Sequence, residues 1–92
     1  MEGFNIIEEK EFYINLGKGL RKLRKARKKT QTQVAKSIGV TFQQLQKYEK
    51  SLNYPKEFYA RKIVDYLGMD YEQFMKENNV LIAKNESNVH TD

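Results

Sequence analysis

The chain has 92 residues, no cysteine, one histidine and a net charge of +5. This length allows one domain at most. Without cysteine there is no disulfide and no thiolate metal site, and His90 alone provides neither a metal site nor a catalytic dyad. The composition therefore predicts a protein that is not an enzyme and that uses no metal or cofactor.

The sequence also indicates where the protein resides. No apolar run approaches the roughly 20 residues that span a bilayer, and the acidic, aromatic N-terminus differs from a signal peptide. We therefore expect a soluble, cytoplasmic protein that does not bind membranes. A basic amphipathic helix can lie on anionic lipid, but the first predicted helix has no tryptophan and needs its leucines for the core.

The charges are distributed unevenly along the chain. Residues 12–48 contain ten basic and no acidic residues, whereas residues 1–11 contain four acids and one base, and residues 49–92 contain eight acids and six bases. Clustered lysine and arginine attract phosphate through counterion release. The alternative is a merely solvated basic helix, but acids are usually interleaved on such a face. The basic block predicts an anionic partner.

Residues 1–12 are expected to form an N-terminal arm or an early helical turn. From Tyr13 onward the apolar spacing predicts a helix with one leucine stripe, formed by Leu16, Leu20 and Leu23. Gly17 and Gly19 each weaken this helix by roughly 1 kcal/mol relative to alanine. The two glycines indicate either the close approach of another element or simple tolerance.

A second helix is predicted over residues 31–38. Thr30 is a suitable N-cap, and Gln33 three residues later completes a capping box. Gly39 follows directly, as expected for a left-handed C-cap. The sequence therefore gives this short helix a defined start and a defined end.

A third helix is predicted to start at Thr41, with Gln44 forming a second capping box. Leu45 and Tyr48 form its inner face. Two helices joined by about three residues, with a glycine at the turn, are typical of a helix-turn-helix.

The remaining elements complete a compact all-α domain of five helices over residues 13–77. Pro55 suits the first turn of a fourth helix, in which Tyr59, Ile63 and Tyr66 form one stripe. Gly68 ends that helix, and Asp70 caps a fifth helix over residues 71–77. Residues 78–92 are expected to be a disordered tail that begins with an apolar patch, Val80, Leu81 and Ile82.

The stretch LGKGLRKLRKARKKTQTQVAKSIGVTFQQLQKYEKSLNYP resembles the lambda-repressor-like helix-turn-helix family, also called the Cro/repressor or xenobiotic-response-element type. The resemblance covers residues 16–74, and its most specific part is the spacing of Arg24, Thr30, Gln31, Val34, Ala35, Gly39, Leu45, Glu49 and Pro55. It implies a five-helix domain that binds double-stranded DNA in a sequence-specific way and regulates transcription.

In this family the third helix, here about residues 41–50, lies in the major groove. The candidate base-reading residues are Thr41, Phe42, Gln43, Gln44, Gln46 and Lys47. Gln43 is the best candidate because its amide can pair with adenine N6 and N7, and Lys47 could donate to guanine. Phe42 either packs on a thymine methyl group or covers the turn as a surface residue. Gln44 and Gln46 lie toward the flanks and are the weaker candidates.

Gln31 resembles the phosphate-binding position of the family, at a helix N-terminus whose free N–H groups favour an anion. The candidate phosphate contacts are Lys28, Lys29, Thr30, Gln31 and Gln33. Capping is the first role of Thr30 and Gln33. Lys25 and Arg27 belong to the same basic run, of which only some members are expected to reach phosphate.

The resemblance gives Arg24 and Glu49 a structural role, as an ion pair between the first and third helices.

Two positions depart from the family pattern. Ser51 replaces a glycine after the third helix, so that this end is expected to fray or turn differently. Lys28 and Lys29 stand where a small residue or glycine is usual, so that this loop is expected to avoid a left-handed turn.

Proteins of this class generally bind DNA as dimers, and the family implies a homodimer on a near-palindromic operator. We expect the fifth helix and the patch of residues 80–82 to form the dimer interface.

Repression of transcription is favoured over activation, because a protein that only binds DNA can already block access to a promoter. The alternative function is an antitoxin-type interaction module, which would hold a protein partner through residues 1–12 or 78–92 and repress its own operon.

Overall fold

The computed structural model describes residues 9–80. It contains five α-helices in chain order, α1 (Glu9–Ala26), α2 (Gln31–Ile38), α3 (Phe42–Glu49), α4 (Glu57–Tyr66) and α5 (Tyr71–Glu77). The predicted all-α, five-helix architecture is confirmed. The expectations for residues 1–8 and 81–92, including most of the terminal segments of the antitoxin alternative, lie outside the described residues.

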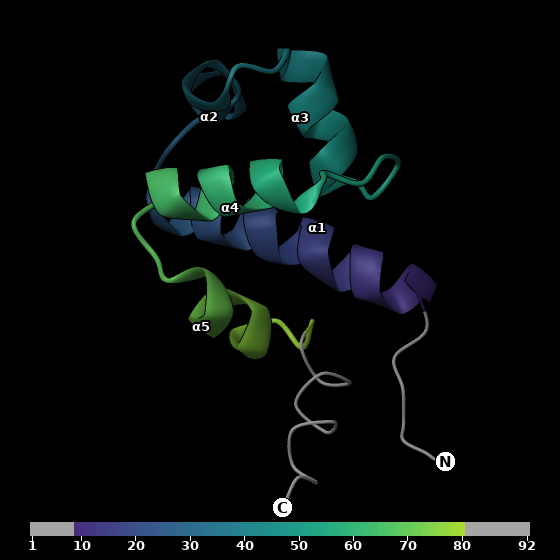
Figure 1. Ribbon diagram of the computed structural model, residues 1–92. Helices are drawn as coiled ribbons and strands as arrows, with labels where there is room; N and C mark the ends of the chain where they lie inside the picture. The colour runs from purple at the N-terminus through teal and green to yellow at the C-terminus, as the bar shows by residue number, and fades with distance from the viewer. Residues whose placement is uncertain (1–8, 81–92) are drawn as a thin grey trace, which may run out of the picture.

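Helices α1 and α4 contact each other in the middle of the molecule, with α2 and α3 on one side and α5 on the other (Figure 1). The core between them is built from leucines and other apolar side chains of all five helices. Its largest fully buried side chains are those of Leu20, Val34, Leu45, Ile63, Val64 and Phe74. No described helix has the length and apolar character needed to cross a membrane.

Helix α1 begins at Glu9, four residues before the start indicated by the leucine stripe. Acidic residues in its first turn and basic residues in its last turn match the polarity of the helix dipole. Its two glycines lie where other segments approach. A Cβ on Gly17 would stand 2.7 Å from the Tyr48 carbonyl oxygen, and one on Gly19 would stand 2.6 Å from Cγ of Asn78. The close-approach interpretation of both glycines is therefore correct.

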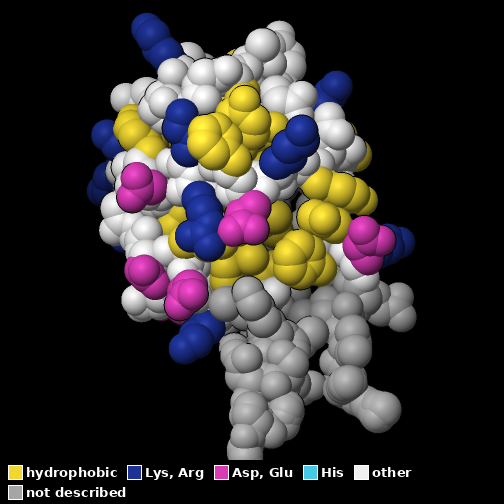
Figure 2. All heavy atoms as spheres, in the orientation of Figure 1, with side chains coloured by type: hydrophobic (Ala, Val, Ile, Leu, Met, Phe, Trp, Pro, Cys, Tyr) yellow, Lys and Arg dark blue, Asp and Glu magenta, His cyan; other side chains and the backbone are white. Residues whose placement is uncertain are grey.

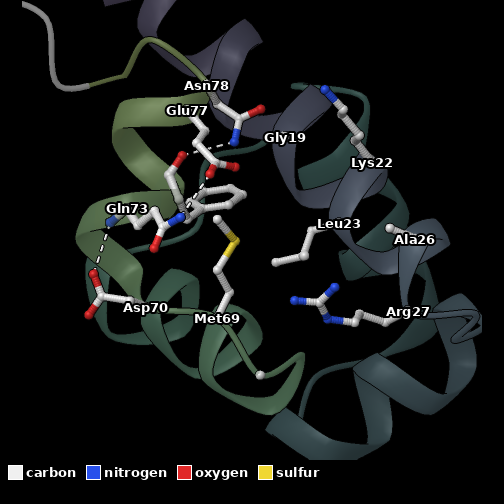
Figure 3. A pocket seen from close by; sticks show the side chains of 12 residues that line it. Gly19, Lys22, Leu23, Ala26, Arg27, Met69, Asp70, Gln73, Glu77 and Asn78 are labelled. Atoms are coloured by element: carbon white, nitrogen blue, oxygen red, sulfur yellow. Dashed lines mark hydrogen bonds between the residues drawn. The ribbon is translucent and has the colours of Figure 1, made fainter.

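A cavity of about 470 Å³ separates α1 from α5 beside Gly19. Figure 3 shows Lys22 of α1 and Arg27, which directly follows α1, on one side of it and Gln73, Glu77 and Asn78 of the α5 segment on the other. The Asn78 side chain donates to the Phe74 carbonyl oxygen at 2.9 Å. Gly19 thus makes room for a polar side chain that closes the end of α5.

The helix-turn-helix is defined by its caps. The Gln33 N–H donates to Thr30 Oγ1 at 3.0 Å, and the Thr30 N–H donates to Gln33 Oε1 at 2.8 Å. Gly39 takes the left-handed conformation, with φ of 80°. The first capping box and the glycine C-cap are therefore confirmed.

The second predicted capping box is only half formed. The Gln44 N–H donates to Thr41 Oγ1 at 3.0 Å, so that Thr41 caps α3 as expected. Among the hydrogen bonds of residues 9–80, the return bond from the Gln44 side chain to the Thr41 N–H is not formed. The hydroxyl alone therefore caps the first turn of α3.

Helix α4 differs from its prediction in two ways. It begins at Glu57 after an extended N-cap, Lys56, so Pro55 precedes the first turn instead of lying in it. The second difference concerns Tyr66, which is 40 % exposed, whereas Leu67 is 2 % exposed. The buried stripe comprises Ala60, Ile63, Val64 and Leu67. A helix packed on both α2 and α5 turns this stripe inward, and Tyr66 lies outside it.

The end of the described chain removes one residue, Val80, from the expected dimer interface. Asp70 caps α5 as predicted, because its carboxylate accepts from the Gln73 N–H at 2.9 Å. Val80 is only 3 % exposed, and its N–H donates to the Met75 carbonyl oxygen at 2.8 Å. Val80 therefore belongs to the core of its own protomer and is not available to a second copy. Leu81 and Ile82 lie outside the described residues.

Candidate nucleic-acid interface

Helix α3 has two distinct faces. Leu45 and Tyr48 are buried in the core, as the apolar spacing predicts. Phe42, Gln43 and Lys47 are exposed, whereas Gln44 and Gln46 are half-buried at the edges of the helix. Thr41 is exposed, but its hydroxyl already accepts the capping bond. The outward face of α3 therefore combines an aromatic ring, an amide and an ammonium group.

Phe42 lies beside the loop that precedes α2. A shallow depression of about 570 Å³ is lined by Phe42 and by side chains of the α1–α2 connection, Arg24, Lys25, Lys28, Lys29, Thr30, Gln31 and Thr32. The fold thus brings the start of α3 next to the predicted phosphate-binding residues. Among these, Thr30 and Gln33 are engaged with each other in the capping box.

The expected ion pair joins α1 to α3. Arg24 Nε donates to Glu49 Oε2 at 2.7 Å, and Arg24 Nη2 donates to Oε1 at 3.0 Å. The two residues are 8 % and 6 % exposed. A buried ion pair contributes little unless its remaining polar groups are also bonded.

Two further bonds extend this pair into a cluster. Arg24 Nη1 donates to the Lys29 carbonyl oxygen at 2.9 Å, and Gln31 Nε2 donates to Glu49 Oε1 at 2.9 Å. The cluster links α1, the loop, the start of α2 and the end of α3. Sequence reasoning assigned Gln31 to phosphate, but did not show that its amide also holds Glu49.

The loop between α1 and α2 contradicts one expectation. The sequence predicts that this loop avoids a left-handed turn, but Lys28 has a φ of 59° and forms one. This conformation costs an L-residue about 1–2 kcal/mol. The Lys28 N–H donates to the Lys25 carbonyl oxygen at 3.0 Å, and the Lys29 N–H donates to that of Arg24 at 3.1 Å. These bonds satisfy the last carbonyl groups of α1 and offset the cost of the turn.

Arg27 also has a structural contact. Its Nε donates to the Leu67 carbonyl oxygen at 2.7 Å, which ties the end of α1 to the end of α4. Of the predicted basic run, Lys25, Lys28 and Lys29 border the depression beside Phe42, whereas Arg27 is not among its lining residues.

Ser51 takes the left-handed conformation at the end of α3, and this end is not frayed. It takes φ of 60°, and its hydroxyl donates to the Tyr13 carbonyl oxygen at 3.0 Å. The Tyr54 ring stacks on the Tyr13 ring with centroids 3.8 Å apart. The loop after α3 is therefore fastened to α1, and the end of α3 is turned sharply at Ser51 despite the missing glycine.

The charge distribution differs between the two sides of the fold. Figure 2, which views the molecule from the side of α4, shows acidic and basic side chains interleaved on this surface. The residues of the α1–α2 connection and of α3 up to Tyr48 include no acid. Among residues 9–80, no three acidic or histidine side chains form a group that could hold a metal ion.

A family model described as helix-turn-helix, of the lambda-repressor-like type, matches residues 20–74. This match covers more than half of the chain, and the protein belongs to the lambda-repressor-like helix-turn-helix family. Membership implies DNA binding, and the family is typically without catalytic activity. None of the curated proteins matches the chain.

Proposed function

We propose that the protein is a sequence-specific transcriptional repressor that inserts α3 into the major groove of double-stranded DNA. The observation that carries this proposal is the division of α3 into a buried face and an exposed polar face beside a basic loop. In a helix-turn-helix, the second helix contacts base edges with its N-terminal residues. Phe42 and Gln43 occupy those positions here.

Three side chains carry the base contacts in this proposal. Gln43 is exposed and pairs through its amide with adenine N6 and N7, and Lys47, one turn later, donates to guanine O6 and N7. Phe42 packs on the methyl group of a thymine. Thr41, Gln44 and Gln46 lie at the margins of the contact, because Thr41 serves as the N-cap and both glutamines are half-buried.

The DNA backbone is held at the start of α2. The first N–H groups of a helix and its positive dipole end favour phosphate, and Gln31, Lys28 and Lys29 surround this position. One Gln31 amide hydrogen is bonded to Glu49, which leaves the other amide hydrogen available for phosphate. Thr30 and Gln33 contribute by holding the helix start in place.

The active species in this proposal is a homodimer on a near-palindromic operator. Two reading helices would contact half-sites separated by one helical turn, roughly 34 Å. Because Val80 is buried within its own protomer, the contact between copies does not use it. Sedimentation of the protein with its operator tests this point, and a single protomer bound to one half-site would contradict it.

The function itself is tested by selecting genomic fragments on the purified protein at about 200 mM salt, where non-specific phosphate binding is weakened. The wild type and the variant Gln43→Ala are compared. Gln73→Ala provides a matched control, because Gln73 is an exposed glutamine on α5 whose side chain, among residues 9–80, bonds to Glu77 of its own helix.

The wild type and Gln73→Ala are expected to recover the same near-palindromic motif, and Gln43→Ala is expected to lose it. Recovery of unrelated fragments by the folded wild type would contradict sequence-specific regulation and leave only non-specific binding by the basic surface.

A further inference from the structure

The outer face of α1 carries a second basic groove outside the interface described above. Its volume is about 640 Å³, and five cations line it, Lys18, Arg21, Lys22, Lys25 and Lys50. The four residues from α1 follow the spacing i, i+3, i+4 and i+7, which places them on one side of the helix. All five are exposed.

The charge of this groove is uncompensated. Among the described residues that line it, Glu49 provides the only carboxylate, and that group is already bonded to Arg24 and Gln31. Like charges four residues apart, such as Lys18 with Lys22 and Arg21 with Lys25, disfavour a helix. On α4, by contrast, Arg61 is paired with Glu57 at 2.7 Å. A face that retains such repulsion is suited to an anionic ligand.

The groove is continuous with the proposed DNA interface. Lys25 and Gln31 line both this groove and the depression beside Phe42. Lys50 follows Lys47 by three residues at the C-terminal end of α3, so the groove begins where the outward face of α3 ends. A duplex that is bound at α3 and at the start of α2 therefore lies next to the outer face of α1.

We propose that the α1 groove binds the sugar-phosphate backbone of the DNA that flanks the base-read segment. This inference rests on the proposed function, because it places the same duplex on α1. Phosphate contacts position a protein on DNA without reading its sequence. The groove therefore raises the affinity for operator and for unrelated duplexes alike, and it extends the footprint beyond the bases that α3 contacts.

The test combines three substitutions in the groove, Lys18→Gln, Arg21→Gln and Lys22→Gln, in the full chain. A control carries Lys10→Gln, Arg61→Gln and Lys62→Gln, which remove the same charge from exposed positions at the start of α1 and on α4. Affinities for the selected operator and for a scrambled duplex are measured by fluorescence anisotropy over a range of salt concentrations. Thermal melting confirms that both variants are folded.

Each phosphate contact contributes about 0.9 to the slope of log affinity against log salt. For each protomer bound, the groove variant is expected to lower that slope by about 2 to 3 and to weaken binding to both duplexes by on the order of 100-fold at 0.1 M salt. The ratio of operator to scrambled affinity is expected to stay constant. The control is expected to keep the wild-type slope.

An unchanged slope in the groove variant, with specific binding by the wild type, would overturn the α1 site and leave the proposed function intact. An equal loss in the control would also overturn it, since the effect would then come from net charge. Failure of the wild type to distinguish operator from scrambled DNA would instead contradict the proposed function.

Discussion

Two arginine–glutamate pairs in this protein have the same separation of 2.7 Å between Nε and Oε2, but they lie in different surroundings. The Arg24 and Glu49 side chains are 10 % and 2 % exposed, whereas those of Arg61 and Glu57 are 54 % and 67 % exposed. The first pair joins residues 25 positions apart, and the second lies within one turn of α4. The distance between the charged atoms therefore does not by itself indicate how much an ion pair contributes to the stability of the fold.

The difference shows how the fold holds α3 in position. Around Arg24 and Glu49, polar bonds connect α1, the loop, α2 and α3, and removal of one partner would leave a buried charge without compensation. On the outer face of α4, solvent screens the pair and both side chains remain hydrated. The α1–α3 junction fixes the orientation of the proposed reading helix. The outer pair supports α4 and, through the Arg61 guanidinium 4.5 Å from the centroid of the Tyr71 ring, the contact of α4 with α5.

The largest effect is expected for Arg24→Ala. Breaking a buried ion pair from one side costs about 3–5 kcal/mol, a large fraction of the stability of a small domain. DNA binding should then be lost through unfolding and not through a missing contact. Thermal melting separates the two causes. A melting temperature equal to that of the wild type would show that the pair does not hold the fold.

A smaller effect is expected for Gly17→Ala. The new Cβ would stand 2.7 Å from the Tyr48 carbonyl oxygen and 2.6 Å from the Ser51 hydroxyl, so α1 and the end of α3 would have to separate. Overpacking of this kind costs roughly 1–3 kcal/mol. Urea denaturation measures the change in the free energy of unfolding.

Gly19→Ala is the matched control for that experiment. The three atoms nearest to its Cβ all belong to the Asn78 side chain, which can move aside at the cost of its bond to the Phe74 carbonyl oxygen, and alanine improves the helix. Gly19→Ala should therefore lower the free energy of unfolding less than Gly17→Ala does. Equal destabilisation by the two variants would contradict the assignment of Gly17 to the α1–α3 junction.

On the α4–α5 side, Tyr71 gives a small dependence on pH. Burial raises the pKa of Tyr71 above its ordinary value, with a further contribution from Glu57 and an opposing one from Arg61. The folded state thus favours the neutral phenol, and its contribution to stability is lost as the pH rises above about 10. Tyr71→Phe should lose less stability than the wild type between pH 8 and pH 11 in urea denaturation. Identical losses would contradict this assignment.

The smallest effect is expected for Arg61→Gln. The side chain is exposed, and pairs of this kind within one helix contribute little because solvent screens them. The melting temperature should fall only slightly, because the contact of Arg61 with the Tyr71 ring is lost and such a contact contributes little at an exposed site, and the affinity for DNA should match that of the wild type. A loss comparable to that of Arg24→Ala would show that exposure does not distinguish the two pairs.

Local sequence signals predicted most of the fold. The Thr30–Gln33 capping box, Gly39 and Asp70 mark helix ends through contacts within a few residues, and the structure contains all of them. The left-handed turn at Lys28 and the burial of Val80 could not be predicted in this way. The burial of Val80 depends on the packing of helices. The turn at Lys28 is closed by local bonds to carbonyl groups of α1, but a lysine gives no signal for a left-handed conformation that glycine normally takes.

The same limit applies to the candidate site. The outward residues of α3 follow from the inward placement of Leu45 and Tyr48, so periodicity alone identifies the exposed face. The bond from Gln31 to Glu49 joins positions 18 residues apart, and no spacing rule predicts it. The groove on α1 could have been suspected from the i, i+3, i+4 and i+7 spacing of its cations, but the contribution of Lys50 requires the fold.

The most direct measurement is the ratio of affinities for the selected operator and for a scrambled duplex, compared between the wild type and Gln43→Ala at fixed salt. One bidentate base contact provides about 1–3 kcal/mol of discrimination. The ratio should therefore fall about 5- to 150-fold per protomer while the melting temperature stays constant, because Gln43 is exposed. An unchanged ratio in a folded Gln43→Ala variant would contradict sequence reading by this face of α3.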